Sequence, residues 1–426
     1  MKYIIDVTQL VHWSGNLTGI PRVMDELAVR FASNGDVEAV FVSWVKELGA
    51  MCELDFTSTR IHRGNGIDYF TASSGSTSSL ATPPVKVLVK KVIKKAAAKS
   101  RFDRTGFYSK AKKLSHTHET KNYKIYVPQS NDKLFIPWGE WWDQNWLNTV
   151  KSYHAAGVKI YPVCHDILPM LVPQFSGNSS SLSEFVKQIF PISSTVLTPS
   201  KSTKRDLAEW MKVHSLPVPN IQSFRLGEDF TINGVVVSDV DMARKYAIEK
   251  DNYLLAVGTI EPRKNHTLLY YTYKLAVARG IKLPKLLIVG RVGHDTSEII
   301  KFIREDPEMA DRVEICTNVS DEDLDWLYQN CMFTVQPSFY EGWGMPVIES
   351  IARGKSAICS NTSSLVEMPT TCVLRFHPAS TDECLQAIQK MMEPSRLKRY
   401  RVAVSKYKLH SWDDSFKQVI TILGDS

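Results

Sequence analysis

Two glutamates flank a glycine-rich turn in the segment SFYEGWGMPVIESIARG, residues 338–354. Glu341 follows the apolar run FTVQPS and should lie at the carboxyl end of a buried strand. Gly342 and Gly344 would let the backbone approach a ligand closely, and Pro346 favours the first turn of a helix. The free N–H groups and the positive dipole end of that helix would then form a site for phosphate.

The second glutamate, Glu349, would lie in the early turns of the same helix, eight residues after Glu341. There its carboxylate can accept two hydrogen bonds from a vicinal diol such as a ribose. A structural interpretation is also open, in which Glu341 ends a strand and Glu349 stabilises the helix dipole. The residues around the two glutamates are needed to decide between ligand binding and a structural role.

The complete segment PSFYEGWGMPVIESIARG resembles the E-x7-E signature of retaining, nucleotide-sugar-dependent glycosyltransferases of the GT-B fold, the group 1 or family 4 class. The glycines, the proline and both acids match together. The resemblance implies that Glu341 acts in catalysis and that the segment binds the sugar-nucleotide donor. The implied donor-binding residues of this segment are Glu341, Gly342, Trp343, Gly344, Met345, Pro346 and Glu349.

Two further segments of the second half resemble the same family. AVGTIEPRKNHTLL looks like the first loop of the family's C-terminal domain, which implies that Lys264 binds the donor diphosphate and acts in catalysis, with Arg263 beside it. Thr259 stands where many relatives carry an arginine, and Arg263 can compensate for this departure. NVSDEDLDWLYQNC looks like the segment whose backbone meets the nucleotide base near Val319, with Leu324 packed behind the base.

The first half carries weaker resemblances. The loop LTGIPRV resembles the family's glycine loop after the first strand, which places Gly19 close to the donor phosphate or the acceptor. In VCHDILP, His165 stands at a strand end where relatives place a residue beside the transferred sugar, so the resemblance implies a catalytic role for His165. HSWDDSF near the C-terminus resembles the last helix of the family, which crosses back to the first domain.

Acidic clusters elsewhere superficially suggest a metal site. These are Asp321, Glu322 and Asp323, and also Asp239 and Asp241. We interpret them as acids at helix starts and in a linker, because GT-B relatives stabilise the departing diphosphate with a helix dipole and basic side chains. No metal ion and no other cofactor is therefore expected.

The order of apolar runs predicts an α/β protein with two doubly wound, Rossmann-like domains that face each other across a cleft. YIIDV and VEAVFVSW open the first unit as a parallel sheet, and YLLAVG, KLLIVG, RVEICT, FTVQPS and SAICSN build the second after a polar linker at 229–251. We place an N-terminal, acceptor-binding domain at 1–235 and a C-terminal, nucleotide-sugar-binding domain at 250–405. Residues 406–426 form the helix that returns to the first domain.

A basic stretch interrupts the first domain as an insertion at about 84–113. Residues 86–113 include eleven lysines or arginines and one acid. At helical spacing its apolar residues share one face, and the other face carries Lys86, Lys90, Lys91, Lys94 and Lys95. This pattern suits a helix that lies on an anionic membrane surface, although a solvated helix packed on its own domain remains the alternative. Nucleic acid is a poorer fit, because few aromatic residues are interleaved.

Composition indicates the number of domains, the redox state of the cysteines and the cellular location to expect. The 426 residues carry a net charge of +7, and 43% of them are hydrophobic, enough for the cores of two or three domains. The seven cysteines are scattered without a C-x-x-C pair, which favours reduced thiols. The start lacks the long apolar core of a secretion signal, and no apolar run is long enough to predict a membrane-spanning helix. We expect a cytoplasmic protein, peripheral on the inner face of the cell membrane.

The resemblance implies a retaining glycosyltransferase that uses a nucleoside diphosphate sugar, with GDP-mannose as the first expectation. The acceptor would be a glycan or a lipid-linked intermediate in the assembly of a surface polysaccharide such as lipopolysaccharide. Two alternatives remain from the sequence. One is a nucleotide-sugar epimerase of similar architecture, and the other is a non-catalytic, membrane-bound scaffold that binds a nucleotide sugar.

Overall fold

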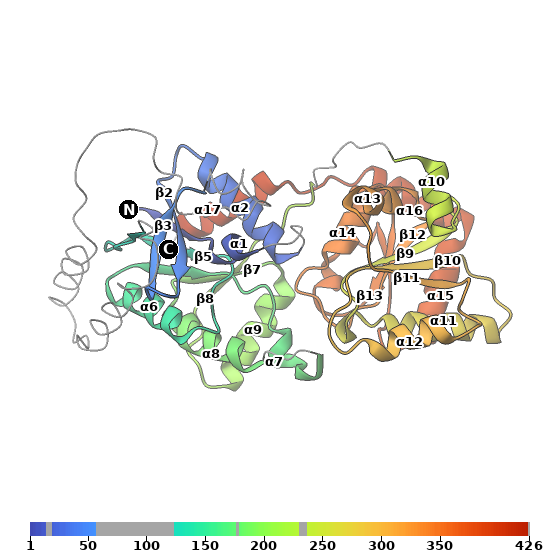
Figure 1. Cartoon of the computed structure of the whole chain (residues 1–426), viewed down its shortest axis with the longest axis horizontal. Coiled ribbons are helices and arrows are strands. Elements are labelled where there is room, and N and C mark those ends of the chain that lie inside the picture. Colours follow the sequence, from blue (N-terminus) through green and yellow to red (C-terminus); the bar gives the residue numbers. More distant parts are fainter. Residues whose placement is uncertain (14–18, 57–122, 176–178, 230–236, 425–426) are drawn as a thin grey trace.

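The structure is a computed structural model of the 426-residue chain, and it describes residues 1–13, 19–56, 123–175, 179–229 and 237–424. Two α/β domains lie next to each other along the long axis of the molecule (Figure 1). The predicted insertion at 84–113, with Lys86, Lys90, Lys91, Lys94 and Lys95, lies outside the described residues. Its membrane role therefore stays a prediction.

The first domain is built on a sheet in which the strand order is β4-β3-β2-β1-β5-β6. The strands are β1 (Tyr3–Asp6), β2 (Ala39–Val45), β3 (Ala50–Leu54), β4 (Lys124–Ile125), β5 (Lys133–Ile136) and β6 (Lys159–Pro162). Strands β1, β2, β5 and β6 are parallel, whereas β3 and β4 pair antiparallel at one edge. The predicted parallel start of this sheet is confirmed by β1 and β2, whereas the antiparallel edge, where β2 turns directly into β3 as a hairpin, was not predicted. Strands β7 (Thr195–Thr198) and β8 (Asn220–Ser223) form a further parallel pair.

Helices cover this domain where apolar residues recur on one face. The helices are α1 (Thr8–His12), α2 (Ile20–Ser33), α6 (Gln144–Ala155), α7 (Leu168–Leu171), α8 (Ser179–Ile189) and α9 (Lys201–Val213). Helix α2 shows the local causes. Gly19 caps its start in a left-handed conformation, and Pro21 lies in its first turn. Its residues Met24, Leu27 and Phe31 are buried in the core of the first domain.

The second domain contains a fully parallel sheet with the order β11-β10-β9-β12-β13-β14. The strands are β9 (Tyr253–Val257), β10 (Lys285–Val289), β11 (Val313–Cys316), β12 (Phe333–Gln336), β13 (Ala357–Ser360) and β14 (Val373–Phe376). The central strands β9, β10, β12 and β13 are almost wholly buried, as expected for a parallel sheet with helices on both faces.

The helices of the second half begin before the predicted domain boundary. They are α10 (Asp239–Tyr246), α11 (His266–Ala278), α12 (Ser297–Glu305), α13 (Asp321–Asn330), α14 (Met345–Ala352), α15 (Thr381–Met392), α16 (Pro394–Ser405) and α17 (Trp412–Gly424). Helix α10 lies in the segment that was predicted to be a polar linker, and this part of the prediction was wrong. Ser238 caps the helix, and Met242 and Tyr246 are buried against the second domain.

The acids that start these helices behave as helix-terminal groups. Asp239 and Asp241 lie in the first turn of α10, and Asp321, Glu322 and Asp323 lie in the first turn of α13. The favourable interaction of a carboxylate with the positive end of a helix explains this placement. In the described part of the chain, no three metal-ligating side chains of the His, Cys, Asp and Glu types gather as a possible metal site.

The two domains contact each other through polar groups from both sides. The backbone N–H groups of Lys201 and Ser202, at the start of α9, donate to the carboxylate of Glu367 at 3.0 and 2.7 Å. Glu367 therefore caps a helix of the other domain. The hydroxyl of Tyr340 donates to Asp206 on α9 at 2.7 Å. These bonds fix the strand ends of the second domain against the first domain.

Helix α17 returns to the first domain, as the sequence predicted. Trp412, Phe416 and Val419 are buried in the same core as Phe31 of α2, and the rings of Phe31 and Phe416 meet edge to face at 5.0 Å. Gly227 lies under the indole of Trp412, where a Cβ atom would approach the ring to 2.3 Å. The return of the chain thus depends on the absence of a side chain at residue 227.

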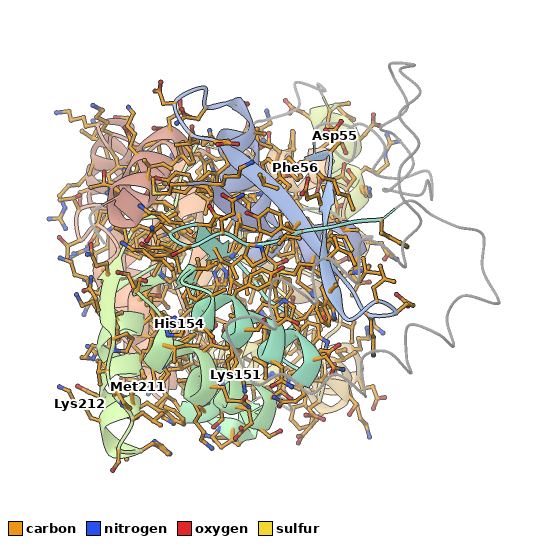
Figure 2. The ribbon with its side chains drawn as sticks, turned by 90° about the vertical axis from the view of Figure 1, so that its left-hand side faces the viewer. Asp55, Phe56, Lys151, His154, Met211 and Lys212 are labelled. Atoms are coloured by element: carbon orange, nitrogen blue, oxygen red, sulfur yellow. The ribbon has the colours of Figure 1, made fainter. Side chains whose placement is uncertain are left out.

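Figure 2 views the first domain end on. Asp55 and Phe56, where the described chain stops before residue 57, lie at the top of this view. Met211 and Lys212 of α9 lie at the lower left, well separated from them. Phe56, the last described residue before residue 57, is therefore remote from the end of α9.

All seven cysteines are buried as free thiols, in agreement with the prediction from their spacing. Burial alone raises the pKa of Cys359 to about 12, so this thiol stays protonated and unreactive at neutral pH. None of the helices in the described ranges is both long and apolar enough to cross a bilayer.

Replacing Trp412 by alanine should test the anchorage of α17. Trp412 is almost fully buried, and removing such a side chain commonly costs about 3–5 kcal/mol of the free energy of unfolding. Urea unfolding of the parent and of the variant measures this difference. Val402→Ala on the exposed face of α16 is the matched control, and it should leave the unfolding midpoint nearly unchanged. Similar midpoints for both variants would contradict the packing of α17 described here.

Candidate active site

A buried carboxylate, Glu341, lies at the carboxyl edge of the second sheet. It follows β12 by five residues, and the neighbouring strand β9 leads into a short 3-10 turn, Pro262–Lys264. Because β9 and β12 are adjacent and parallel, the segments that follow them meet at the same edge. This topology brings Lys264 and Arg263 to Glu341, although 77 residues separate Lys264 from it.

Every oxygen of the Glu341 carboxylate has a donor. Oε1 accepts hydrogen bonds from Lys264 Nζ at 2.6 Å, from Ser338 Oγ at 2.6 Å and from Gln336 Nε2 at 3.1 Å. Oε2 accepts from Arg263 Nη1 at 3.0 Å. Both Lys264 and Glu341 are buried, so the pair is a true interior ion pair.

This environment keeps Glu341 ionised. Burial by itself would raise the pKa of its carboxyl, but the charges of Lys264 and Arg263 outweigh burial and lower the pKa of Glu341 to about 2. Arg263 also pairs with Glu261. The edge of the sheet therefore holds two cations whose charges are balanced by carboxylates.

Glu349 lies on α14 and faces both domains. Its Oε1 accepts from Arg22 Nη1 of α2 at 3.0 Å, and its Oε2 accepts from the hydroxyl of Tyr328 at 2.9 Å. The carboxylate is partly exposed. Helix α14 begins at Met345 after Gly344, which adopts a left-handed conformation (φ 103°) and whose added Cβ would lie 2.6 Å from Leu365. Only glycine adopts this positive φ readily and also leaves the space that Leu365 occupies.

His165 of the first domain lies directly opposite the Glu341 segment. An added Cβ on Gly342 would lie 2.2 Å from the carbonyl oxygen of His165. Gly342 therefore permits the backbones of the two domains to touch beside the predicted catalytic residues. The imidazole Nε2 of His165 donates to the carbonyl of Pro137 at 2.7 Å, and burial lowers the pKa of His165 to about 4. The ring is neutral at neutral pH.

The other predicted donor-binding residues have no hydrogen bond to Glu341 in the described structure, and they lie in several elements of the two domains. Trp343 and Met345 pack against the core of the first domain, next to Pro346 in the first turn of α14. Val319 and Leu324 are partly buried beside the core formed by α13 and β9. Gly19 lies at the start of α2, three residues before Arg22.

Several residues of this site were not predicted. Arg22 is the most informative, because it carries a cation from the first domain to Glu349. The sequence offered a signal in GIPRV, where the arginine follows the predicted glycine loop, but nothing showed that it would face a residue more than 300 positions away. Ser338, Gln336 and Tyr328 lay close to predicted motifs and escaped notice because their types are common in structural roles.

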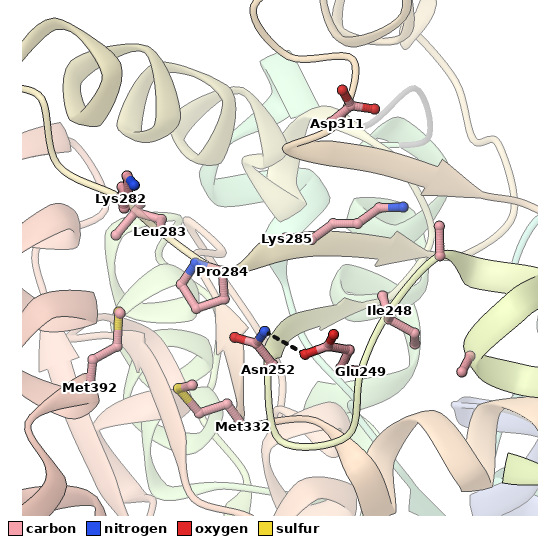
Figure 3. Close-up of a pocket in the computed structure, with 12 residues that line it drawn as sticks. Ile248, Glu249, Asn252, Lys282, Leu283, Pro284, Lys285, Asp311, Met332 and Met392 are labelled. Carbon is pink, nitrogen blue, oxygen red and sulfur yellow. Dashed lines mark hydrogen bonds between the residues drawn. The ribbon is translucent and has the colours of Figure 1, made fainter. Parts of the chain in front are cut away.

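A cavity of about 620 Å³ lies at the opposite edge of the second sheet, away from this site. Figure 3 shows Lys285, Pro284 and Met332 on its wall and the hydrogen bond from Asn252 to Glu249. These residues lie at the amino ends of β9, β10 and β12. Ligands of doubly wound sheets bind at the carboxyl ends, so the Glu341 edge is the stronger candidate.

Part of the chain matches a known protein family. Residues 239–408 match the family model described as "Glycosyl transferases group 1". The serotype-specific mannosyltransferase WbdA of Escherichia coli is 26% identical over 235 residues, which are 54% of this chain and 29% of WbdA. The O-antigen chain mannosyltransferase RfbU of Salmonella typhimurium is 26% identical over 257 residues, which are 60% of this chain and 66% of RfbU. The chain thus spans less than a third of WbdA.

Solved structures resemble the chain over its whole length. HepE of Anabaena in complex with UDP-glucose has a TM-score of 0.62 at 15% identity and covers all of both chains. Sucrose-phosphate synthase of Thermosynechococcus elongatus has a TM-score of 0.61 at 16% identity, and the match covers 100% of this chain and 99% of that one. Such low identities establish the fold alone. It is the GT-B fold that the sequence predicted.

The pH dependence of stability should report the charge of Glu341. Its pKa is about 2 in the folded chain against an ordinary value of 4.5, so the ionised carboxylate stabilises the fold above about pH 4.5 and this contribution is lost as the pH falls towards 2. The contribution is about 3 kcal/mol, since a pKa difference of one corresponds to about 1.4 kcal/mol. Glu341→Gln should therefore be less stable than the parent at pH 7, and the gap should narrow with acidification.

Urea unfolding at a series of pH values measures this gap. Glu184→Gln is a suitable control, because Glu184 is exposed and bonds to Lys187 and Gln188 of its own helix. The free energy of unfolding of this control should equal that of the parent at every pH. A gap between the parent and Glu341→Gln that stays constant from pH 7 down to acid would contradict the ionised state of Glu341.

Proposed function

Because residues 239–408 belong to the group 1 glycosyltransferases, we propose that this chain transfers a mannosyl residue from GDP-mannose to a glycan or lipid-linked acceptor. Several relatives are named mannosyltransferases, which supports mannose as the transferred sugar. Two of these names refer to O-antigen chains, which supports an acceptor in surface-polysaccharide assembly. The donor base rests on the sequence resemblance. The structural neighbour HepE was solved with UDP-glucose, so the base is the part of the proposal that most needs a direct test.

The observation that carries the proposal is the buried ion pair of Lys264 and Glu341 opposite His165. Two cations, Arg263 and Lys264, lie at the carboxyl edge of the sheet, near the start of α14. A diphosphate needs this combination of fixed positive charges and helix N–H groups. We assign the diphosphate to Arg263, Lys264 and the first turn of α14.

The ribose is assigned to Glu349. In the chain as described, Arg22 and Tyr328 occupy the two oxygens of this carboxylate. A ribose diol that takes one of these oxygens would displace the guanidinium of Arg22 and release it towards the phosphates. Val319 and Leu324 would then flank the base, and Gly19 would lie near the phosphates or the acceptor, as the resemblance implies.

The proposed transfer retains the anomeric configuration. The bond between the anomeric carbon and the β-phosphate oxygen breaks, and its electron pair leaves with the nucleoside diphosphate. A hydroxyl oxygen of the acceptor attacks from the same face, and its proton passes to the departing phosphate oxygen. Lys264 and Arg263 stabilise the charge that develops on that phosphate, and Glu341 and His165 lie beside the sugar that is transferred.

No divalent metal is required in this proposal, because basic side chains and a helix dipole supply the positive charge at the diphosphate. We also propose that the chain binds the inner face of the cell membrane peripherally through the basic face that carries Lys86, Lys90, Lys91, Lys94 and Lys95. The support for this second proposal is the sequence pattern alone.

Donor specificity and metal dependence can be tested together. We expect GDP-mannose to raise the thermal transition of the parent more than UDP-glucose at equal concentration, because a ligand that binds only the folded state stabilises it. Slow release of mannose and GDP without acceptor should persist in EDTA. Lys264→Ala should lower this rate by about 100-fold or more, as the loss of a group that stabilises transition-state charge does. Lys274→Ala, an exposed ion-pair lysine of α11, is the matched control.

Three outcomes would oppose the proposal. A larger thermal shift with UDP-glucose would reassign the donor, and loss of activity in EDTA that magnesium or manganese restores would reveal a metal site. Conversion of the donor to a C2 epimer would favour the epimerase alternative.

The membrane proposal predicts sedimentation with anionic vesicles that weakens as salt rises, because each exposed cation near such a surface contributes about 1 kcal/mol. Changing Lys90, Lys91, Lys94 and Lys95 together to glutamate should abolish sedimentation and leave the affinity for the donor intact. Unchanged sedimentation of this variant would remove the membrane contact and leave the transferase proposal standing.

A further inference from the structure

Tryptophans concentrate at the carboxyl edge of the first sheet, next to His165. Six of the ten tryptophans in the chain lie along this edge: Trp13, Trp44, Trp138, Trp141, Trp142 and Trp146. Four of them belong to the segment after β5, which begins at Pro137. That residue accepts the hydrogen bond from His165, so the segment starts beside the predicted catalytic histidine. The donor site described above uses none of these tryptophans.

The segment is held in place by a buried polar scaffold. Asp6, at the end of β1, accepts a hydrogen bond from the indole Nε1 of Trp146 at 3.1 Å. The ring of Trp146 lies directly under Gly139, where an added Cβ would approach it to 2.3 Å. Trp44 Nε1 donates to Asp143 at 3.1 Å at the far end of the segment. Both ends of the segment are therefore fixed before any ligand arrives.

Helix α1 and the residue after it face this segment. Gln9 and Trp13 are four positions apart, and they meet the segment at two points. Gln9 Nε2 donates to the carboxylate of Glu140, and the rings of Trp13 and Trp138 lie 6.5 Å apart with an angle of 54° between them. The ring contact and the polar pair therefore join the segment on either side of Gly139, at Trp138 and at Glu140.

Two residues beyond Glu140 the segment carries an exposed indole, Trp142. The hydrogen bond from Asp143 N to the carbonyl of Glu140 closes a turn that carries Trp142 outwards. Half of the surface of Trp142 is exposed (51%), more than for any other of the ten tryptophans, all of which are among the described residues. An indole at this position has no share in the core of the domain.

We propose that Gln9, Trp13, Trp138, Glu140 and Trp142 form one surface, here termed the aromatic shelf, and that this surface binds a pyranose ring of the acceptor saccharide. This inference rests on the proposed function, because it names the acceptor class of the same site. It commits to a saccharide and to no other class of partner. The shelf lies in the first domain, and its segment begins next to Pro137, whose carbonyl accepts the hydrogen bond from His165.

The chemistry of the shelf matches a sugar ring on both of its sides. The C–H face of a pyranose is apolar and packs on the flat faces of indole rings, while its hydroxyls at the rim need hydrogen-bond partners. Glu140 and the amide of Gln9 supply such partners within the same surface. Burial, with the nearby charges of Asp6 and Asp143, raises the pKa of Glu140 to about 7, so this carboxyl can both donate and accept near neutral pH.

Intrinsic fluorescence offers a direct test, because the proposed ligand contacts tryptophans. The full chain is titrated with α-linked mannotriose, and with maltotriose as a second probe, and the tryptophan emission is recorded. We expect a saturable change for at least one of the two saccharides. Trp142→Ala, Trp13→Ala and Glu140→Gln should each weaken the affinity for that saccharide by about tenfold, as the loss of a central contact residue does. Tyr271→Ala on α11, which is similarly exposed (48%) in the other domain, should bind as the parent does.

The same variants are then assayed with GDP-mannose. Their donor hydrolysis without acceptor should match the parent, whereas their KM for the saccharide should rise by about the same factor as the binding constant. Unchanged saccharide binding in all three variants, or no emission change with either saccharide in the parent, would overturn the aromatic shelf. Failure of the parent to bind or hydrolyse any nucleotide sugar would instead overturn the proposed function, so the two failures are distinguishable.

Discussion

The buried carboxylate of Glu341 is the constraint on which the candidate site depends. An ionised carboxylate inside a protein must be neutralised, because the cost of removing its charge from water is several kcal/mol. Lys264 and Arg263 supply that neutralisation, and Ser338 and Gln336 satisfy the remaining hydrogen-bonding capacity. These cations can reach Glu341 because β9 and β12 are adjacent, so the residues after both strands lie at the same edge of the sheet. The positive charges that neutralise Glu341 are of the kind that a diphosphate needs.

The contact between the domains follows from the same segment. Gly342, directly after Glu341, allows the backbone to touch the carbonyl of His165. Tyr340, directly before it, donates to Asp206 of α9. The segment predicted to be catalytic is therefore also one through which the second domain contacts the first. A substitution that disturbs this contact would change the position of His165 relative to Glu341 together with the orientation of the domains.

The sequence predicted the parts of this arrangement that are local. Strand, glycines, proline and acids between residues 338 and 354 specify a strand end, a tight turn and a helix start, and all three are found. The ion pair of Arg22 with Glu349 could not be foreseen, because it depends on how two separately folded domains are placed. Helix α10 was missed because its polar composition outweighed the capping signal of Ser238. The antiparallel edge was missed because β4 has only two residues and residues 57–122 separate it in the sequence from its partner β3.

The central claim is that the cations paired with Glu341 are the binding site of the donor diphosphate. Calorimetric titration of GDP and of guanosine into the parent and into the double variant Lys264→Met/Glu341→Gln tests this claim most directly. The double substitution removes both members of the pair, so no buried charge is left uncompensated and the fold is preserved. The account predicts that the parent prefers GDP strongly over guanosine and that the double variant loses most of this preference. An equal preference for GDP in both proteins would contradict it.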